Sequence, residues 1–439
     1  MVYAANAIHY GWSPSSRTWI DDAAAWATGI ALLWLYWLGY QALQRFGHVQ
    51  SPRRVLVPAI PLLLLAFVTI PYDSTDAFLY IAVGHAEAQF GMNPYTTTLR
   101  EVPGALDDPA LDAWMRSSKN PWQDLPLVYG FGFALLIKAA AWLGHGSWVW
   151  TLGILKAINA GAFAGIAAMV WTIARRLGHS RPDLALYLFA WSPLILLHHI
   201  ANAHNDILVG FFIVLAFYLV LAQRSAFAPA CLVSAALIKY ISLPLIPILL
   251  VFTARREGWR RALLGAAMGS IVALLLSLPF AGSVARFRWD LMDAQLNKVT
   301  AGSLYSFFYY LFRFAGPADL LPTFGSALKM VLWLVTGLFA AWQVWRLFRR
   351  PGVEISDLLS TCSWILFAII FLGSSQFYSW YLGMVFPAVL LLSPEHALRR
   401  LTVLLGGTHV FSLTSLSRKG IGYFMATTGV ALALSRRKF

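Results

Sequence analysis

The sequence has little charge and almost no cysteine. Asp, Glu, Lys and Arg make up 12% of its 439 residues, whereas soluble domains carry about 25%. Both cysteines, Cys231 and Cys362, fall inside apolar runs, so neither their spacing nor their location indicates a disulfide or a metal site. The low charge excludes a large soluble domain between the apolar runs.

Three other signals are also missing. We expect no cleavable signal peptide, because the first apolar run (about 23–42) follows a polar stretch with acids and is too long for a signal core. No glycine fingerprint for a dinucleotide is present, so no nucleotide site is expected. No internal repeat stands out, whereas secondary transporters are typically built from repeats.

Apolar runs are present from one end of the chain to the other. They predict an all-α polytopic membrane protein with about thirteen transmembrane helices, organised as a single domain over residues 1–439. The formal net charge is +14, but the basic residues cluster in short loops, which indicates cytoplasmic loops rather than a nucleic-acid-binding surface. The clusters are Arg45/Arg53/Arg54, Arg175/Arg176/Arg181, Arg255/Arg256/Arg260/Arg261, Arg346/Arg349/Arg350, Arg399/Arg400 and Arg436/Arg437/Lys438.

The basic clusters fix a predicted topology with the N-terminus outside and the C-terminus inside. Two large outer loops follow from it, over 71–146 and 282–324. In the first, the segment 130–143 is short and contains Lys138, so we expect an interfacial or re-entrant helix there. The predicted spans are 23–44, 53–70, 147–174, 183–199, 207–223, 262–281, 326–346, 357–373, 380–393 and two C-terminal helices, whose outer turn with Arg418 and Lys419 departs from the charge pattern.

The long apolar stretch between Arg224 and Arg255 requires a break. Both arginines are predicted to be cytoplasmic, so a single spanning helix cannot join them. Two short helices that meet at Lys239 satisfy the topology and place this lysine near the outer face. There it is either a snorkelling side chain or a contact for an anion such as a lipid phosphate. Arg286 and Arg288, which follow the next span, leave the same two interpretations.

Two carboxylates follow the second predicted span directly. Asp73 and Asp76 lie in "PYDSTDAFLY", where they are either solvated acids at a helix end or functional groups, since acids near the hydrocarbon are rarely idle. If Ser74 or Thr75 caps an interfacial helix, Asp76 lies near the positive end of its dipole and Tyr80 lies on the same face. The carboxylate then stays ionised at neutral pH, as a general base requires. We assign that role to Asp76 and a supporting role to Asp73.

The stretch "HHIANAHND" (198–206) lies at the same predicted outer surface. Asn205 and Asp206 either cap the following helix or, with His204, bind substrate hydroxyls, support the base or bind a metal. The spacing of the three histidines matches no tetrahedral site, so we assign no metal and leave a divalent ion open.

The segment "FYSWYL" supplies aromatic side chains at the same predicted surface. Tyr378, Trp380 and Tyr381 either belong to an aromatic belt at the membrane interface or stack on a sugar ring.

Taken in order, these motifs resemble those of the GT-C superfamily of integral-membrane glycosyltransferases. The nearest resemblance is to the bacterial polyprenyl-phosphate-mannose-dependent mannosyltransferases, those like glycosyltransferase family 87, and it covers roughly residues 50–395. The motifs are Asp76-Ala-Phe-Leu-Tyr80 with Gly84, "GMNPY" (91–95), "NPWQDLPLVYGFG" (120–132, with Phe131 where the family has proline), "NAHNDILVG", "AALIKYISLPLIP" and "FYSWYL".

The resemblance implies a GT-C fold and a concrete activity. The donor would be a polyprenyl-phosphate sugar, with mannose implied by the family, and its phosphate would lie at Lys239, Arg286 and Arg288. Asp76 would deprotonate an acceptor hydroxyl that attacks the anomeric carbon with inversion. Substrate contacts would come from Tyr80, His204, Asn205, Tyr378, Trp380 and Tyr381, with Asp73 and Asp206 as supporting acids. No cofactor is expected.

The expected partners are the lipid bilayer, the lipid-linked donor and a hydroxyl-bearing glycan, glycolipid or other acceptor. We expect a monomer in the bacterial inner membrane with its active site facing the periplasm or exterior, and no nucleic-acid partner. Two alternatives stay open. A transporter or flippase-type protein would also use many helices and buried charges, and a lipid-phosphate-linked ligase or flippase accessory would share the phosphate site without a catalytic base.

Overall fold

The computed structural model describes residues 19–72, 74–104, 121–288, 291, 298–300, 302–409 and 424–431. This part of the chain is helical and contains no β-strand. Its α-helices are α2 (Trp19–Arg45), α3 (Arg53–Leu56), α4 (Ile60–Val68), α5 (Asp76–Phe90), α7 (Phe131–Leu143), α8 (Trp148–Arg176), α9 (Pro182–Ala190), α10 (Asp206–Leu221), α11 (Ala228–Ala236), α12 (Leu245–Glu257), α13 (Trp259–Ser277), α15 (Leu304–Ala315), α16 (Leu321–Arg349), α17 (Ile355–Ala368), α18 (Leu382–Val389) and α19 (Ala397–Thr408).

The all-α polytopic membrane class is confirmed. Four described helices are long and apolar enough to cross a membrane, and a fifth span arises if α9 and the following π-helix Ile195–Ala201 count as one. Shorter apolar helices accompany them. The total of about thirteen spans stays a prediction, as do the membrane placement of the loops 71–146 and 282–324 and the single-domain organisation.

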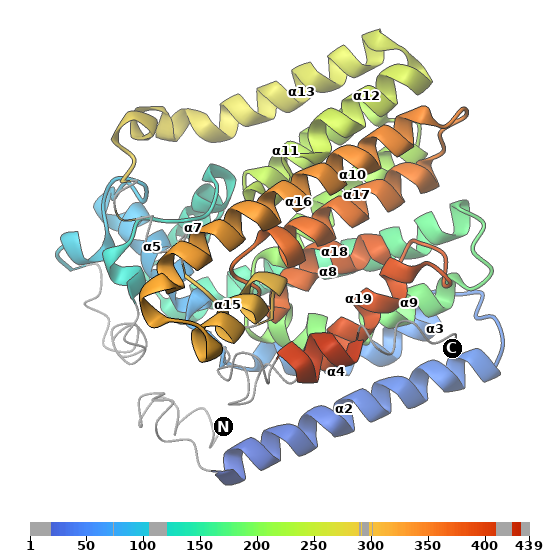
Figure 1. Ribbon diagram of the computed structural model, residues 1–439, viewed down its shortest axis with the longest axis horizontal. Helices are drawn as coiled ribbons and strands as arrows, with labels where there is room; N and C mark the ends of the chain where they lie inside the picture. The colour runs from blue at the N-terminus through green and yellow to red at the C-terminus, as the bar shows by residue number, and fades with distance from the viewer. Residues whose placement is uncertain are drawn as a thin grey trace.

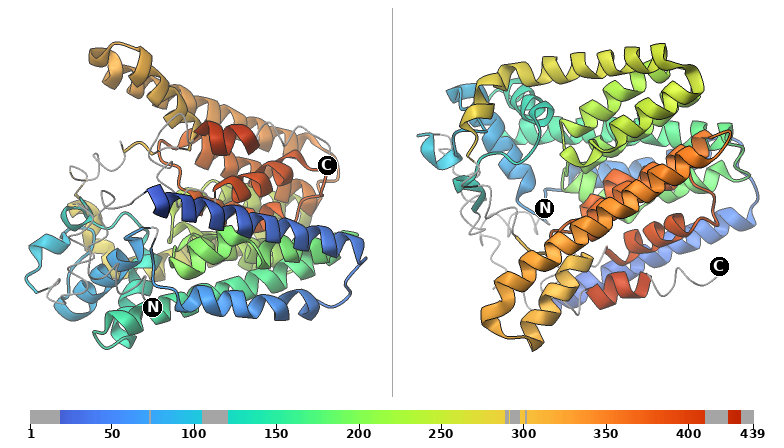
Figure 2. Two further views of the ribbon diagram at one scale, coloured as in Figure 1. Left: turned by 90° about the horizontal axis from the view of Figure 1, so that it is seen from below. Right: turned by 45° about the horizontal axis from the view of Figure 1, so that its top comes forward.

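The helices form a bundle whose two ends differ in character (Figure 1). The α2–α3, α8–α9, α12–α13 and α16–α17 connections, which carry the basic clusters of the sequence, gather at one end (Figures 1 and 2). Arg181 holds two of these connections together: Nη2 donates to the Leu43 carbonyl at 2.7 Å and pairs with Asp183 at 2.9 Å. α5, α7 and α15 gather at the opposite end, so the separation of basic loops from outer loops has a structural counterpart.

Breaks in the apolar helices position the polar residues. The predicted span 183–199 is two segments, α9 and the π-helix, bent by 50°; Pro193 lies in the break, where it cannot continue the α9 hydrogen-bond ladder. The predicted break at Lys239 is confirmed, because α11 ends at Ala236 and α12 begins at Leu245. Polar side chains near these two breaks, such as His204 and Lys239, can therefore face the interior of the protein.

The helix predicted to begin at Asp76 is confirmed, and neighbouring helices bury it. α5 starts at Asp76, and the Asp76 N–H donates to Ser74 Oγ at 3.2 Å. Its residues Ala77–Glu87 are buried, because α7 and α8 pack against it. A hydropathy pattern cannot distinguish a helix covered by protein from one laid on lipid, so this burial could not be predicted, and the place of α5 at the membrane interface stays a prediction.

Gly84 lets α5 and α7 pack closely. A Cβ at Gly84 would lie 2.5 Å from the Ile137 carbonyl oxygen, a backbone atom that cannot move alone. Gly84→Ala should therefore destabilise the protein by about 1–3 kcal/mol, the usual cost of overpacking. Thermal unfolding of the purified protein in detergent measures the effect.

Gly153→Ala on α8 is the matched control, since a Cβ there meets no atom within 4 Å. We expect it to be neutral or slightly stabilising, because alanine favours the helix over glycine. Equal unfolding midpoints for the two variants would contradict the close α5–α7 contact.

Candidate active site

The central contact of the site joins Asp76 to His204. Asp76 begins α5, whereas His204 lies in the short connection between the π-helix and α10. Asp76 Oδ2 lies 3.5 Å from His204 Nδ1, and His204 Nε2 lies 3.3 Å from Ser74 Oγ. The imidazole is fully buried, but 14% of the Asp76 side chain is exposed, so the carboxylate is the accessible member of the pair.

His204 also belongs to a stack of three rings. Its imidazole lies 4.0 Å from the Trp380 indole, with 11° between the planes. Trp380 stacks in turn on Tyr378, at 4.5 Å and 12°. The contact of Nε2 with Ser74 and the stacking on Trp380 orient the imidazole, and its Nδ1 faces the Asp76 carboxylate. The structure thus brings together three motifs that are far apart in the sequence.

A buried ion pair lies beside this stack. Lys239 Nζ donates to Asp206 Oδ1 at 2.6 Å, and the Asp206 side chain is fully buried. The ammonium also lies over the Tyr381 ring at 4.6 Å and over the Tyr129 ring at 5.4 Å. Tyr80 donates from its hydroxyl to the Tyr129 hydroxyl at 3.0 Å. The charge of Lys239 is therefore shared between a carboxylate and two aromatic faces.

The connection that carries His204 is held from both sides. Asn159 of α8 donates its side-chain amide to the His199 carbonyl at 2.8 Å and to the His204 carbonyl at 3.1 Å. Asn202 accepts from the Tyr72 N–H at 2.7 Å, which ties the connection to the segment before α5. Ala203, between Asn202 and His204, has a left-handed backbone with φ of 56°.

Asn205 is the N-cap residue of α10, but its side chain makes no capping bond. It is 1% exposed, and neither of its amide atoms has a hydrogen-bond partner among the described residues. Asp206 Oδ2 is likewise unpartnered. Buried polar atoms without partners are costly, so this end of α10 has capacity to bind further polar groups.

Lys298 is a cation of the site that sequence reasoning missed. The Lys298 carbonyl accepts from Ser375 Oγ at 3.1 Å, and the Thr300 N–H donates to the Ser375 carbonyl at 3.2 Å. These bonds place the 298–300 segment beside the chain that leads into Tyr378. Lys298 is half-buried and its charge acts on Asp76. Its only sequence signal was one lysine in a long outer loop.

The ionisation of Asp76 results from two opposed effects. Burial alone would raise the pKa of its carboxyl, but the hydrogen bond and charge of His204, together with Lys239 and Lys298, outweigh burial and hold the pKa below its usual value. Asp76 is therefore a carboxylate at neutral pH. The cause is the neighbouring cations as well as the expected position at the start of a helix.

The other predicted residues divide into those near this cluster and those apart from it. Asp206, Lys239, Tyr80, His204, Asn205, Tyr378, Trp380 and Tyr381 belong to it by the contacts above. Arg286 is exposed, and Arg288 lies 3.7 Å from Glu101, so the contacts described for these arginines do not reach Asp76. Asp73 lies outside the described residues. Tyr129 was not predicted as a site residue, although it belongs to the motif quoted for residues 120–132.

A metal site does not emerge from the same groups. In the described ranges, no three His, Cys, Asp or Glu side chains are arranged to hold a metal ion. The histidines near Asp206 face different partners: Gly383 lies so close to His199 that a Cβ there would be 2.1 Å from Nε2, whereas His204 faces Asp76 and Ser74.

A second buried carboxyl lies on the same helix as Asp76. Glu87 is 3% exposed, and its Oε1 lies 3.5 Å from Lys138 Nζ of α7. Burial raises the pKa of Glu87 to about 7, although Lys138 opposes the shift. The unfolded chain releases this proton near pH 4.5, so the folded protein binds more protons than the unfolded chain between about pH 4.5 and 7.

Stability should therefore fall as pH rises from about 4.5 to about 7. The Glu87 contribution is fully present below that window, is lost through it and amounts to about 3 kcal/mol at most. Thermal unfolding in detergent at pH 5, 6, 7 and 8 measures it. Glu87→Gln should flatten this part of the profile, and a variant with the wild-type slope would contradict the assignment to Glu87.

The geometry defines a membrane-embedded protein with an ionised carboxylate, cations and stacked aromatic rings gathered where helices break. The chain belongs to a family of mannosyltransferases: the family model described as Alpha-(1->6)-mannopyranosyltransferase, N-terminal domain, matches residues 5–255. The matched range includes Asp76, His204, Asp206 and Lys239. The resemblance inferred from the motifs is thereby confirmed.

One characterised relative is similar over part of its length. Alpha-(1->6)-mannopyranosyltransferase A of Mycobacterium tuberculosis is 24% identical over 205 residues, which cover 46% of this chain and 37% of the relative. The match thus spans little more than a third of that relative. No solved structure matches.

Proposed function

We propose that the protein transfers a mannosyl unit from a polyprenyl-phosphate donor to a hydroxyl of a mannoside acceptor, forming an α-(1→6) linkage. The mannosyl unit and the linkage follow from the family and from the named relative. The observation that carries the proposal is the Asp76 carboxylate, which is partly exposed, 3.5 Å from a buried histidine and ionised at neutral pH.

In the proposed step, Asp76 acts as general base. The acceptor hydroxyl oxygen attacks the anomeric carbon of the donor as its proton passes to the Asp76 carboxylate. The bond from the anomeric carbon to the phosphate oxygen breaks, and its electron pair leaves with the polyprenyl phosphate. Attack opposite the leaving group inverts the anomeric centre. His204 keeps the base in position through the contact with Nδ1.

The cations stabilise the leaving phosphate in this proposal. Lys239 and Lys298 supply positive charge that acts on Asp76 and that would lower the energy of the developing anion. Lys239 also pairs with Asp206, so its charge is shared between that carboxylate and the leaving phosphate. No cofactor is proposed, because the leaving group is a stable anion without proton transfer.

Tyr378 and Trp380 are proposed as the sugar platform. Trp380 stacks on both Tyr378 and His204, Tyr378 is the more exposed of the two proposed rings, and Asn205 offers unpartnered amide atoms for hydroxyl groups. The basic loops at the opposite end of the bundle are proposed to be cytoplasmic, so the site faces the periplasm or exterior of the inner membrane. We propose that the protein acts as a monomer.

The direct test supplies donor and acceptor to the purified full-length protein in detergent. Synthetic polyprenyl-phosphate mannose and a short α-mannoside should give a product with one added residue, and nuclear magnetic resonance should identify an α-(1→6) bond. Guanosine diphosphate mannose is the control donor and should give no product. Transfer from the nucleotide donor alone, or donor binding without turnover under all acceptors tried, would overturn the proposal and favour a carrier in the second case.

A further inference from the structure

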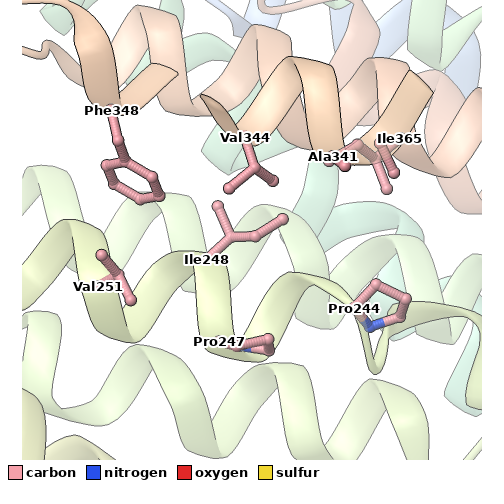
Figure 3. A pocket seen from close by; sticks show the side chains of 9 residues that line it. Pro244, Pro247, Ile248, Val251, Ala341, Val344, Phe348 and Ile365 are labelled. Carbon is pink, nitrogen blue, oxygen red and sulfur yellow. The ribbon is translucent and has the colours of Figure 1, made fainter. Parts of the chain in front are cut away.

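An apolar cleft separates α12 from α16 at the periphery of the bundle (Figure 3). Its volume is about 320 Å³, and its lining is made of aliphatic, proline and phenylalanine side chains. Pro244, Ile248 and Val251 contribute from α12 and the turn before it, Val344 and Phe348 from α16. Ile365 of α17, which is 1% exposed, lies at its floor. The cleft belongs to none of the residues used in the proposed reaction.

The cleft opens toward lipid. The membrane-crossing part of α16 is 17% buried inside the protein, whereas that of α17 is 67% buried. α16 therefore lies at the periphery with α17 behind it, and the space between α16 and α12 is reached from the bilayer. A hydrocarbon chain matches such a lining, since it has no polar atoms that need partners.

One end of the cleft carries uncompensated positive charge. Arg255 Nη1 donates to the Phe348 carbonyl at 2.5 Å, and the guanidinium lies 5.4 Å from the centre of the Phe348 ring. Arg346 and Arg349 flank Phe348 on α16. All three arginines are exposed, and none pairs with a carboxylate in the described part of the chain. Exposed guanidinium groups at the end of an apolar cleft supply the donors and the charge that an anionic head group needs.

Indole rings place this end at the membrane surface. Trp342 and Trp345 on α16 are about half exposed, at 47% and 54%, and they lie beneath the guanidinium groups of Arg346 and Arg349 at 5.6 and 4.9 Å. Tryptophan of this kind marks the level of lipid head groups. A phosphate among the arginines would therefore lie at head-group depth, with the apolar cleft directly beside it.

We propose that the α12–α16 cleft is a binding site for an anionic phospholipid, with its phosphate on Arg255 and Arg349 and one acyl chain along Ile248, Val344 and Phe348. Basic pockets between transmembrane helices on the cytoplasmic side favour lipids of this charge. The lipid-linked sugar donor is the rival occupant. Its phosphate would lie at the other end of α12, near Lys239, so the position of the anion separates the two.

The test measures thermal unfolding of the full chain in detergent with added lipid. Phosphatidylglycerol should raise the midpoint by about 2 °C or more over phosphatidylcholine of the same chains, as expected for a ligand that binds only the folded state. Arg255→Gln should abolish the difference and Arg255→Lys should keep most of it. Arg260→Gln, which removes an exposed arginine from the neighbouring α13, is the control and should behave as wild type.

Three results would overturn the proposal. Equal shifts with the two lipids would remove the anion site, and an Arg255→Gln variant that keeps the wild-type response would move it elsewhere. Native mass spectrometry gives the third result. If polyprenyl phosphate displaces bound phosphatidylglycerol to the same extent from wild type and from Arg255→Gln, the cleft belongs to the donor. Val344→Leu narrows the cleft without changing its polarity, so it should reduce the extra stabilisation by phosphatidylglycerol. It tests the cleft independently, in case Arg255→Gln does not fold.

Discussion

Asp76→Asn should lower the rate of mannosyl transfer by about 10²–10⁴-fold, the range that a positioned general base contributes. The amide keeps the shape of the side chain and its place at the start of α5, but it cannot accept the acceptor proton. Because 14% of the Asp76 side chain is exposed and the amide is close in size to the carboxylate, we expect the variant to fold. Product formation under saturating donor and acceptor measures the effect.

The pH dependence provides a second readout of the same substitution. The cations around Asp76 hold its pKa below the usual value of a carboxyl, so wild-type activity should stay level down to weakly acidic pH and fall only below it. Asp319→Asn, which alters an exposed acid outside the site, is the control and should keep full activity. Transfer by Asp76→Asn within about threefold of wild type would exclude Asp76 as the base.

Asp206→Asn should destabilise the protein by about 3 kcal/mol, because it leaves the Lys239 ammonium without its carboxylate among aromatic rings. The pair is short, at 2.6 Å, and Asp206 is fully buried, so water cannot replace the lost partner. Lys239→Met should cost a similar amount, since it leaves the Asp206 carboxylate buried and unpaired. Chemical or thermal unfolding in detergent measures both.

The double variant separates stability from transfer. Asp206→Asn combined with Lys239→Met removes both charges, and replacement of a buried pair by neutral groups is often close to neutral in stability. The double variant should therefore unfold near the wild-type midpoint yet remain poor in transfer, because the positive charge near the leaving phosphate is lost. Full transfer by a stable double variant would limit this pair to a structural role.

The local features of the site could be predicted from sequence, because they depend on neighbours along the chain. Asp76 begins α5 as the Ser74–Thr75 signal indicated, and the break at Lys239 follows from two basic loops that must share one face. The pairing of these elements could not be predicted. Nothing in the sequence states that Lys239 meets Asp206, or that His204 lies between Asp76 and Trp380, since both depend on how the helices pack.

Contacts within the second outer loop could not be predicted from the sequence either: Lys298 was missed, and Arg286 and Arg288 were predicted as phosphate contacts. Arg286 and Arg288 were favoured as phosphate contacts because they follow an apolar run directly, but the described contact of Arg288 is with Glu101. Lys298 lies deeper in the same loop, and only its pairing with the chain before Tyr378 brings it to Asp76. The sequence predicts on which side of the membrane a charged loop residue lies. The path of the backbone within the loop determines which side chains it contacts.

The left-handed Ala203 makes the turn before His204 stiff. An alanine in this conformation costs about 1–2 kcal/mol relative to a relaxed backbone, whereas glycine would adopt it freely. Alanine, which adopts this conformation less readily than glycine, thus lies directly beside His204, the histidine that contacts the Asp76 carboxylate. A glycine would widen the range of backbone angles open to this turn and let the imidazole move, so the strained alanine limits how far the Asp76 carboxylate can shift from its position.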